Sequence, residues 1–329
     1  MYHLGKIGMD TQQEDSKKIQ KLQDMYSKQY LKRDDMHLII FYCLISSFVL
    51  LQPIYGCNSN KQETLSIATF NIAWLGDGKD PETINRTSDD IVRIADIIQE
   101  MQSDIIALQE IENEEAIQRI LQYLPDYSAF IGKKGRSQNV GFLYRTSLSI
   151  KDLGEYSPIA IDPNRNRPGY VVQIKKGNFD CVLMSVHFKS TSRYDSTDEL
   201  RIESRNMRTE QSKRALSWMD SILQLGNEQD LFIIGDFNDF PKRKKDQTLQ
   251  SLAESNTGVF LTSELKSCKF QNLYAIDHIY ASTSAKTRYI SGSERMIDIH
   301  SMYSKDIAEK VSDHCPVILQ FDVSQVDND

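Results

Sequence analysis

The chain has 329 residues, of which 40% are hydrophobic and 26% are charged, so it is long enough to bury a large core. Its 39 basic and 46 acidic residues give a net charge of −7. An acidic chain is not of the class that coats nucleic acid by bulk positive charge. Any contact with a polyanion must therefore come from a local basic patch or from a metal ion.

The chain begins with a polar leader and an apolar run. Residues 1–35 are polar, and residues 38–51 form an apolar run that is short for a membrane span, which needs about 20 residues. The run fits the hydrophobic region of a secretory signal. The Ile-Tyr-Gly-Cys segment that ends at Cys57 resembles the bacterial lipoprotein cleavage box, in which the cysteine becomes the lipidated first residue. We expect residues 1–57 to be a polar leader plus a lipoprotein-type signal segment.

This interpretation predicts an exported lipoprotein of the cell envelope that is anchored to the membrane by a lipid at Cys57. Tyr55 is bulky for a lipoprotein cleavage site, so other interpretations stay open. They are simple secretion, a membrane anchor, and a cytosolic protein with a buried hydrophobic helix.

Residues 58–64 are a short polar linker, and strand and helix patterns alternate after it. The apolar periodicity predicts helices over residues 88–101, 114–124 and 198–225. It predicts strands over residues 65–74, 104–109, 127–131, 140–144, 170–174, 181–187, 231–236, 276–281 and 316–321. Such mixing indicates one α/β domain with layered sheets, which we place at residues 65–323.

Three of the five cysteines follow the leader, and their spacing fits no zinc-binding pattern. Cys181 and Cys315 lie in apolar, strand-like runs, so we expect buried free thiols. A disulfide is the alternative if the domain is exported.

Several predicted strands begin or end at polar residues, an unusual pattern if these residues only solvate loops. If the strands bring these residues to one rim of a sheet, they form an oxygen-rich site that suits Mg²⁺, and also Mn²⁺ or Ca²⁺, better than zinc. The segments are Thr69-Phe70-Asn71, Leu108-Gln109-Glu110, Ser185-Val186-His187, Gly235-Asp236-Phe237-Asn238, Ile276-Asp277-His278 and Ser312-Asp313-His314.

The order and content of these segments resemble the endonuclease/exonuclease/phosphatase superfamily, which includes deoxyribonuclease I. The resemblance runs from about Ser66 to Phe321, and its strongest motifs are those at residues 235–238 and 312–314. It implies a four-layered α/β/β/α sandwich, with two packed mixed β-sheets flanked by helices. It also implies a metal-dependent phosphoric ester hydrolase.

The resemblance implies roles for single residues as well. Glu110 would be the main Mg²⁺ ligand, with Asn71 and Asp313 beside it. Asp236 would position or deprotonate the attacking water. Asn238 would hold a phosphate oxygen or orient Asp236.

Two histidines complete the implied site. His314 would contact the scissile phosphate, with Asp277 orienting its ring. His187 matches a second histidine of the deoxyribonuclease I and sphingomyelinase branches, and Arg167 matches a phosphate-binding arginine. In the deoxyribonuclease I branch a glutamate supports the second histidine, but residues 139–142 read Asn-Val-Gly-Phe here, which leaves the partner of His187 open.

Two basic clusters could contact a phosphate backbone. The Lys-Arg-Lys-Lys run at residues 242–245 follows the motif at residues 235–238, and Lys133, Lys134 and Arg136 form a similar group. Charge runs of this kind are usually solvated loops, so both interpretations stay open.

The pattern therefore predicts an exported Mg²⁺-dependent phosphodiesterase, foremost a nuclease that hydrolyses phosphodiester bonds of DNA or RNA. The main alternative is a phosphatase or sphingomyelinase-type phosphoesterase with the same metal centre. A binding or scaffold protein without activity is a third, weaker interpretation, because every core site residue is present. We expect a monomer whose partners are the phosphodiester substrate and the membrane.

Overall fold

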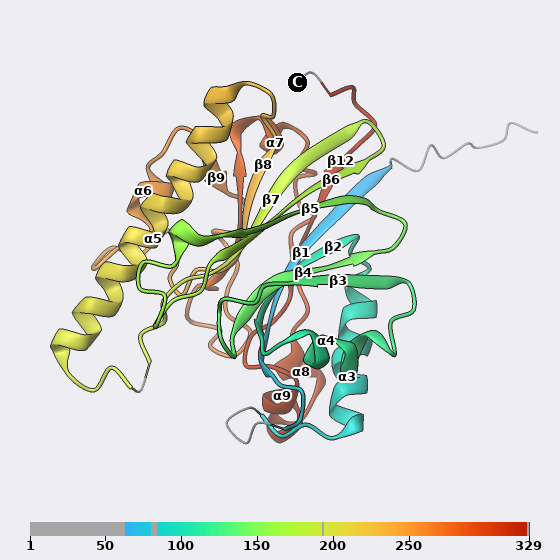
Figure 1. Ribbon diagram of the computed structural model, residues 1–329, viewed down its shortest axis with the longest axis vertical. Coiled ribbons are helices and arrows are strands. Elements are labelled where there is room, and N and C mark those ends of the chain that lie inside the picture. The colour runs from blue at the N-terminus through green and yellow to red at the C-terminus, as the bar shows by residue number, and fades with distance from the viewer. Residues whose placement is uncertain (1–62, 80–83, 193, 328) are drawn as a thin grey trace, which may run out of the picture. The chain divides into compact units, whose positions relative to one another are not determined.

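The computed structural model describes residues 63–79, 84–192, 194–327 and 329, and these form two six-stranded sheets (Figure 1). The first sheet contains, in spatial order, β11 (Arg295–Met296), β12 (Val317–Asp322), β1 (Thr64–Leu75), β2 (Ile105–Ile111), β4 (Asn139–Arg145) and β3 (Tyr127–Ile131). The second contains β5 (Ser149–Tyr156), β6 (Gly169–Lys176), β7 (Phe179–His187), β8 (Leu231–Asp236), β10 (Asp277–Ser282) and β9 (Gly258–Phe260). The predicted leader and Cys57 lie outside the described residues.

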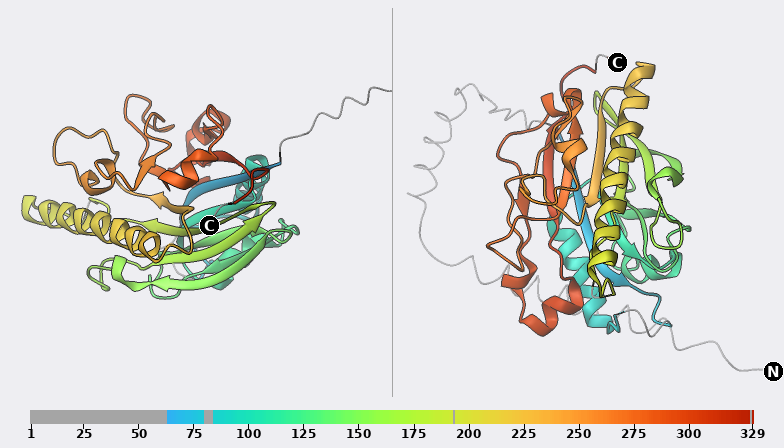
Figure 2. Two further views of the ribbon diagram at one scale, coloured as in Figure 1. Left: turned by 90° about the horizontal axis from the view of Figure 1, so that it is seen from above. Right: turned by 90° about the vertical axis from the view of Figure 1, so that its left-hand side faces the viewer.

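Helices cover the outer face of each sheet (Figures 1 and 2). The helices against the first sheet are α3 (Ser88–Met101), α4 (Glu114–Leu121), α8 (Ile299–Met302) and α9 (Lys305–Val311). Those against the second sheet are α5 (Asp198–Leu225) and α6 (Gln250–Ala253), with the short turn η1 (Ser157–Ile159) packed beside them. Helix α7 (Thr283–Thr287) follows β10. The expected four-layered sandwich of two mixed sheets is confirmed.

Strand β1 shows how the sequence builds these layers. Side chains alternate across a strand. Leu65 and Ile67 pack in the core between the sheets, whereas Ala68 and Phe70 pack under the helices. All four are fully buried, because both faces of the strand are covered. Asn71 continues the set that faces the other sheet, so its amide lies where the apolar core between the sheets ends.

The predicted elements are present, and their ends differ from the prediction by at most three residues. Helix α3 begins after Thr87, whose hydroxyl accepts the Asp90 N–H while the Asp90 carboxylate accepts the Thr87 N–H. Strand β5 was not predicted, since all of its residues are exposed or half-buried and give no apolar alternation. Helices α6 to α9 were also missed, as each has at most seven residues.

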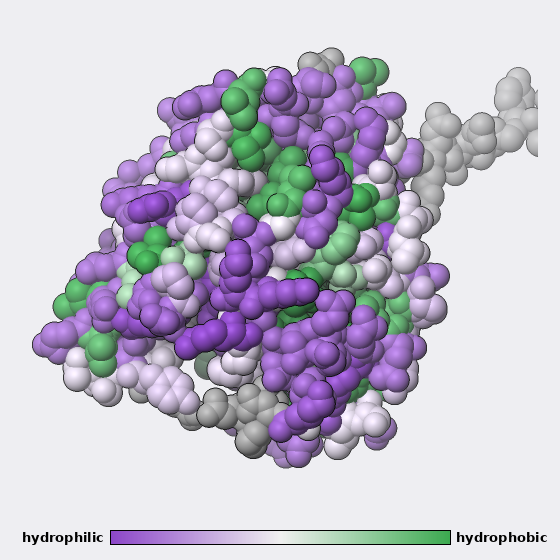
Figure 3. All heavy atoms as spheres, viewed as in Figure 1, coloured by the Kyte–Doolittle hydropathy of each residue, from purple (hydrophilic) through white to green (hydrophobic). Residues whose placement is uncertain are grey.

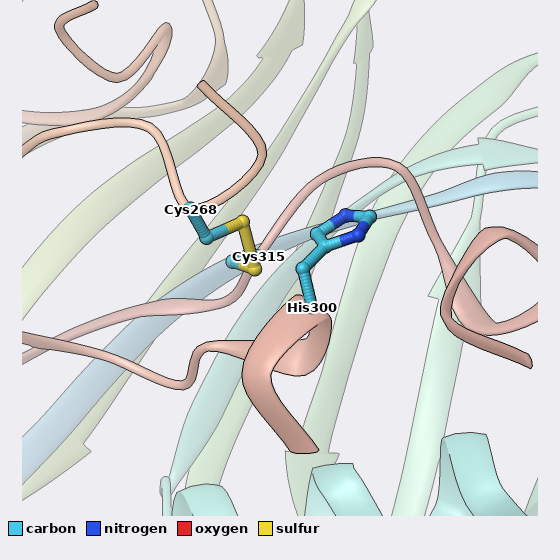
Figure 4. A group of neighbouring side chains, drawn as sticks. All are labelled: Cys268, His300 and Cys315. Carbon is cyan, nitrogen blue, oxygen red and sulfur yellow. A yellow bond between two sulfur atoms is a disulfide. The ribbon is translucent and has the colours of Figure 1, made fainter. Parts of the chain in front are cut away.

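The expectation of a free thiol is wrong for Cys315, which forms a disulfide with Cys268 (Figure 4). The apolar run correctly indicates a buried position, since Cys315 is 2% exposed. The pairing is not visible in the sequence, because 47 residues separate the two cysteines and the segment between β9 and β10 brings Cys268 across. Cys181 is a buried free thiol, as predicted.

None of the helices in the described part of the chain is both long enough and apolar enough to cross a membrane.

Candidate active site

The ends of three neighbouring strands place their polar side chains in one row. In the second sheet His187 of β7 pairs in register with Asp236 of β8, which pairs with Asp277 of β10. The strand alternation points all three toward the first sheet, because Phe232 and Ile234 of β8 belong to the core between the sheets. The predicted site therefore lies at the rim where the two sheets meet.

Glu110 reaches the site through a local inversion of strand β2. Ile106 and Leu108 face the helices, and regular alternation would turn Glu110 the same way. Glu110 instead has φ +64°, a left-handed conformation that is uncommon for residues other than glycine. The inversion returns Ile111 to the helix side, and the pairing of β2 with its neighbours shifts at this point. A strained backbone position thus aims a carboxylate at the rim.

The Glu110 carboxylate is held by polar groups of three residues from two segments. Its Oε1 accepts a hydrogen bond from Asn71 Nδ2 at 3.2 Å. Its Oε2 accepts one from the Trp74 N–H at 3.0 Å and one from Gln138 Nε2 at 3.1 Å. Arg167 Nη2 donates to Gln138 Oε1 at 2.9 Å, so Gln138 links the two residues that the sequence singled out.

Asp236 lies at the centre of the site and is 1% exposed. Its carboxylate accepts hydrogen bonds from Asn71 Nδ2 at 3.1 Å, from Asn238 Nδ2 at 3.0 Å and from the Asn238 N–H at 2.8 Å. His187 Nε2 and His314 Nε2 lie 3.4 Å and 3.8 Å from Asp236 Oδ2. Two roles were considered for Asn238, holding a phosphate oxygen and orienting Asp236; this geometry fits the second.

Gly235 allows this placement of Asp236. Its φ of +146° is a conformation that residues with side chains rarely adopt. A Cβ atom there would lie 2.0 Å from the Val186 carbonyl oxygen. The glycine therefore lets β7 and β8 approach closely just before the catalytic rim.

Burial raises the pKa of Asp236 to about 7. The charge of His314 and the Asn238 N–H oppose this shift, whereas the nearby carboxylates of Asp277 and Glu110 add to it. A carboxylate with a pKa near neutrality can accept a proton from water at ordinary pH, which agrees with the role expected for Asp236.

His314 and Asp277 are paired. Nδ1 of His314 lies 2.7 Å from Asp277 Oδ2. Burial alone would lower the pKa of His314, but the carboxylates of Asp277 and Asp236 raise it well above its ordinary value. The ring is therefore held in its charged form, with Nε2 directed to the site. The Ser312 hydroxyl fixes the loop that carries His314. It accepts a hydrogen bond from the His314 N–H at 2.9 Å and donates one to the Asn71 carbonyl at 2.6 Å.

His187 has no supporting acid on its second nitrogen. Its Nδ1 is buried and has no hydrogen-bond partner among the described residues, which agrees with the absence of an acid at residues 139–142. Its Nε2 lies 3.8 Å from Glu110 Oε1. Burial lowers the pKa of His187 well below its usual value, and the charges of Arg167 and His314 lower it further. This histidine is therefore neutral, unlike His314.

Asp313 stands apart from the buried carboxylates. Its side chain is 52% exposed and lines the same cleft, with Oδ1 4.0 Å from His314 Nε2. Its role as a ligand beside Glu110 stays a prediction.

Arg86 organises two site loops and was not singled out from the sequence. It is 4% exposed, and its guanidinium donates to backbone carbonyls at both ends of the rim. The acceptors are the carbonyl oxygens of Ile72 (2.7 Å), Ala73 (2.7 Å), Trp74 (3.0 Å), Lys310 (2.5 Å) and Val311 (3.2 Å). The side chain thus joins the bend that follows Asn71 to the loop that carries Asp313. No local pattern marks such a role, since all five acceptors are main-chain atoms.

The site opens into a cleft of about 1390 Å³. Five cationic side chains from four segments line it: Arg136, Arg165, Arg167, Lys189 and Lys269. Lys189 was not singled out from the sequence, although it follows His187 by two residues. Burial lowers the pKa of both Lys189 and Arg167, and Lys189 is held 3.6 Å from Asp195.

The basic run at residues 242–245 does not line this cleft. Lys242 forms an ion pair with Glu264, and Arg243 forms one with Asp239. Lys244 and Lys245 are exposed. Of the two basic clusters, only the one at residues 133–136 reaches the cleft, through Arg136.

The donor atoms at the rim fit a hard divalent cation. Glu110, Asp236 and Asp313 supply carboxylates at the cleft. Glu110 Oε1 and Asp236 Oδ1 each accept one hydrogen bond from the protein and keep a second lone pair. Asn71 Oδ1 accepts the Ala73 N–H at 2.9 Å and keeps a second lone pair. No cysteine belongs to this rim, so the set differs from a structural zinc site.

The chain matches the Endonuclease/Exonuclease/phosphatase family model over residues 68–314, and it belongs to that family. It is thus a phosphoric ester hydrolase of a family in which metal dependence is characteristic. No curated protein matches the sequence.

Several solved structures have the same fold. TDP2 of D. rerio, humanized by 14 mutations, is 20% identical, with a TM-score of 0.55 over 78% of this chain and 98% of that one. The human nocturnin catalytic domain is 15% identical, with a TM-score of 0.54 over 78% and 94%. A mannosyl-6-phosphatase of Bacteroides thetaiotaomicron is 15% identical, with a TM-score of 0.51 over 78% and 98%. At these identities the likeness shows the fold alone.

The pairing of Asp277 with His314 gives a pH prediction. Because Asp277 holds the pKa of His314 up, the charged ring persists to higher pH. Asp277→Asn should therefore move the alkaline limb of the kcat/KM profile to lower pH and reduce kcat on the order of 10²–10⁴. The measurement is the pH–rate profile on bis-p-nitrophenyl phosphate.

A matched control is Asp220→Asn, which removes a carboxylate that accepts a hydrogen bond from Thr257 outside the cleft. It should leave the profile unchanged. The Asp277→Asn/His314→Ala double variant should be little worse than His314→Ala alone, since Asp277 and His314 act as a unit. Additive losses with an unmoved profile would show that Asp277 does not serve His314.

Proposed function

We propose that this protein is a Mg²⁺-dependent phosphodiesterase that hydrolyses nucleic acid. The observation that carries the proposal is the form of the cleft, in which five cationic side chains surround a carboxylate rim. A single phosphate could engage only part of that wall, whereas a chain of phosphates could engage cations on several segments. The surface seen in Figure 3 is mainly hydrophilic, with smaller hydrophobic areas, and the net charge is −7. The positive charge that a polyanion needs is therefore local.

An aromatic side chain supports the same substrate class. Tyr194 is 74% exposed and lines the same cleft as Lys189 and Arg165. Exposed aromatic rings next to cations are a usual platform for unpaired bases, which stack on them with little sequence preference.

In the proposed mechanism each residue has one task. When bound, the divalent cation supplies Lewis-acid stabilisation of the phosphate charge. Asp236, with its pKa of about 7, orients water and takes a proton from it. Charged His314 donates from Nε2 to the phosphate or to the leaving oxygen. Arg167, which is held by Gln138 and lines the cleft, binds the phosphate.

A sphingomyelinase-type phosphoesterase is the second candidate, and one observation favours it. Phe270 and Leu273 are 58% and 56% exposed on the segment between β9 and β10, which also carries the cleft residue Lys269. Exposed apolar side chains beside a phosphoesterase site could contact a lipid surface.

The proposal is tested with a substrate panel. The substrates are plasmid DNA, RNA, sphingomyelin, an inositol phosphate and bis-p-nitrophenyl phosphate, each with Mg²⁺, Mn²⁺, Ca²⁺ or chelator. We expect nucleic acid and the small diester to be cleaved with Mg²⁺ and neither to be cleaved with chelator. If only sphingomyelin or only the inositol phosphate were cleaved, the proposal of a nuclease would be wrong.

A variant of Arg136 separates polymer binding from chemistry. Arg136→Ser should raise KM for nucleic acid and flatten its salt dependence, because a phosphate contact releases counterions. The rate on the small diester should barely change. Lys244→Ser is the matched control, since Lys244 is equally exposed but lies outside the cleft. Equal losses on both substrates would mean that Arg136 is structural.

We also propose that the protein is exported and anchored by a lipid at Cys57. The Cys268–Cys315 disulfide supports export, because disulfides persist in oxidising compartments. Expressed in a bacterium, the chain should partition with membranes and take up labelled fatty acid, and Cys57→Ser should lose both. A soluble native protein that begins at Met1 would contradict the proposal.

A further inference from the structure

The Cys268–Cys315 disulfide lies beside a histidine that the proposed reaction does not use. Figure 4 shows the imidazole of His300, on helix α8, next to the two sulfur atoms. Cys315 directly follows His314 in the chain, so this group adjoins the catalytic loop without belonging to the cleft.

The three side chains could converge on one ion. One ligand atom of each of Cys268, His300 and Cys315 lies within 4.8 Å of the others. Nε2 of His300 is buried and has no hydrogen-bond partner among the described residues. A buried ring nitrogen without a partner is costly, and binding to a metal would satisfy it. Cys268 is partly exposed, so a small thiol can reach the disulfide.

Reduction converts the disulfide into two metal ligands. One external thiolate attacks a sulfur of the disulfide, which releases one cysteine and forms a mixed disulfide with the other. A second external thiolate then attacks the external sulfur of the mixed disulfide and releases the second cysteine. The products are two cysteine thiols and one external disulfide, so electrons and protons balance. Zinc bound by two thiolates and an imidazole needs Zn–S distances of about 2.3 Å and Zn–N distances of about 2.0–2.1 Å. The sulfurs would then lie about 3.8 Å apart in a tetrahedral site, within the present spread of ligand atoms.

We propose that Cys268, His300 and Cys315 form a zinc-class metal site that exists only when the disulfide is reduced. Oxidised, the pair is a covalent link between the β9–β10 segment and the catalytic loop. Reduced, it offers two sulfurs and one nitrogen, with a fourth position for water, and binding of the ion displaces the two thiol protons. Disulfide and metal are mutually exclusive, since both use the same sulfur atoms.

The test compares zinc binding by the oxidised and reduced full chain. Both are prepared with Glu110→Gln to weaken binding at the catalytic rim, and Zn²⁺ is titrated against a chromophoric indicator after the reductant has been removed under nitrogen. We expect the reduced protein to bind one more equivalent of Zn²⁺ than the oxidised protein. Zinc should also protect two thiols of the reduced protein from alkylation. Equal zinc binding in the two states would overturn the proposal, and this comparison needs no cysteine variant.

Variants then assign the ligands. His300→Ala should weaken the extra zinc binding by about 100-fold or more, since loss of a direct ligand exceeds the usual effect of outer partners. Cys268→Ser should abolish it. Cys181→Ser is the matched control, because Cys181 is a buried free thiol outside this group, and it should change nothing. Unchanged affinity in His300→Ala would show that the extra ion is held elsewhere.

Discussion

The site depends on one carboxylate that is buried and, among the described residues, has no paired lysine or arginine. Asp236 is 1% exposed; the amides of Asn71 and Asn238 donate hydrogen bonds to it, and the charged ring of His314 lies nearby. Burying a carboxylate is costly unless hydrogen bonds and charge compensate. The compensation comes from both sheets, so the chemistry requires the sandwich to close. A pKa of about 7 follows from the incomplete compensation and suits a proton acceptor at neutral pH.

The fold supplies this compensation through strand geometry. The site residues of β1, β7, β8 and β10 occupy strand positions that face the opposite sheet. They lie on the same strand faces as the apolar core residues, just beyond the edge of that core. The same alternation that buries leucine and isoleucine in the middle of each strand directs polar groups to a common rim at its end. Hydrogen bonds from the Arg86 side chain to main-chain carbonyls then hold the loops in place, together with the disulfide that follows His314.

Much of this was predictable from the sequence, because apolar alternation fixes the strands and the motifs at residues 235–238 and 312–314 indicate the family. Three features were not. The left-handed turn of Glu110 breaks the alternation from which a strand is inferred. Arg86 and Gln138 act through contacts between distant segments, and the Cys268–Cys315 pairing spans 47 residues. Such contacts depend on tertiary packing and leave no local pattern.

The proposed reaction depends on a divalent cation that is bound by the Glu110 carboxylate. The direct measurement is turnover of bis-p-nitrophenyl phosphate by the parent chain and by Glu110→Gln across a magnesium titration, with folding checked by circular dichroism. The substitution keeps the size and removes the charge of the ligand. We predict saturable activation by Mg²⁺ for the parent and almost no turnover for the folded variant at ordinary Mg²⁺. Near-parental turnover of Glu110→Gln throughout the titration would show that Glu110 does not hold a cation that the reaction needs.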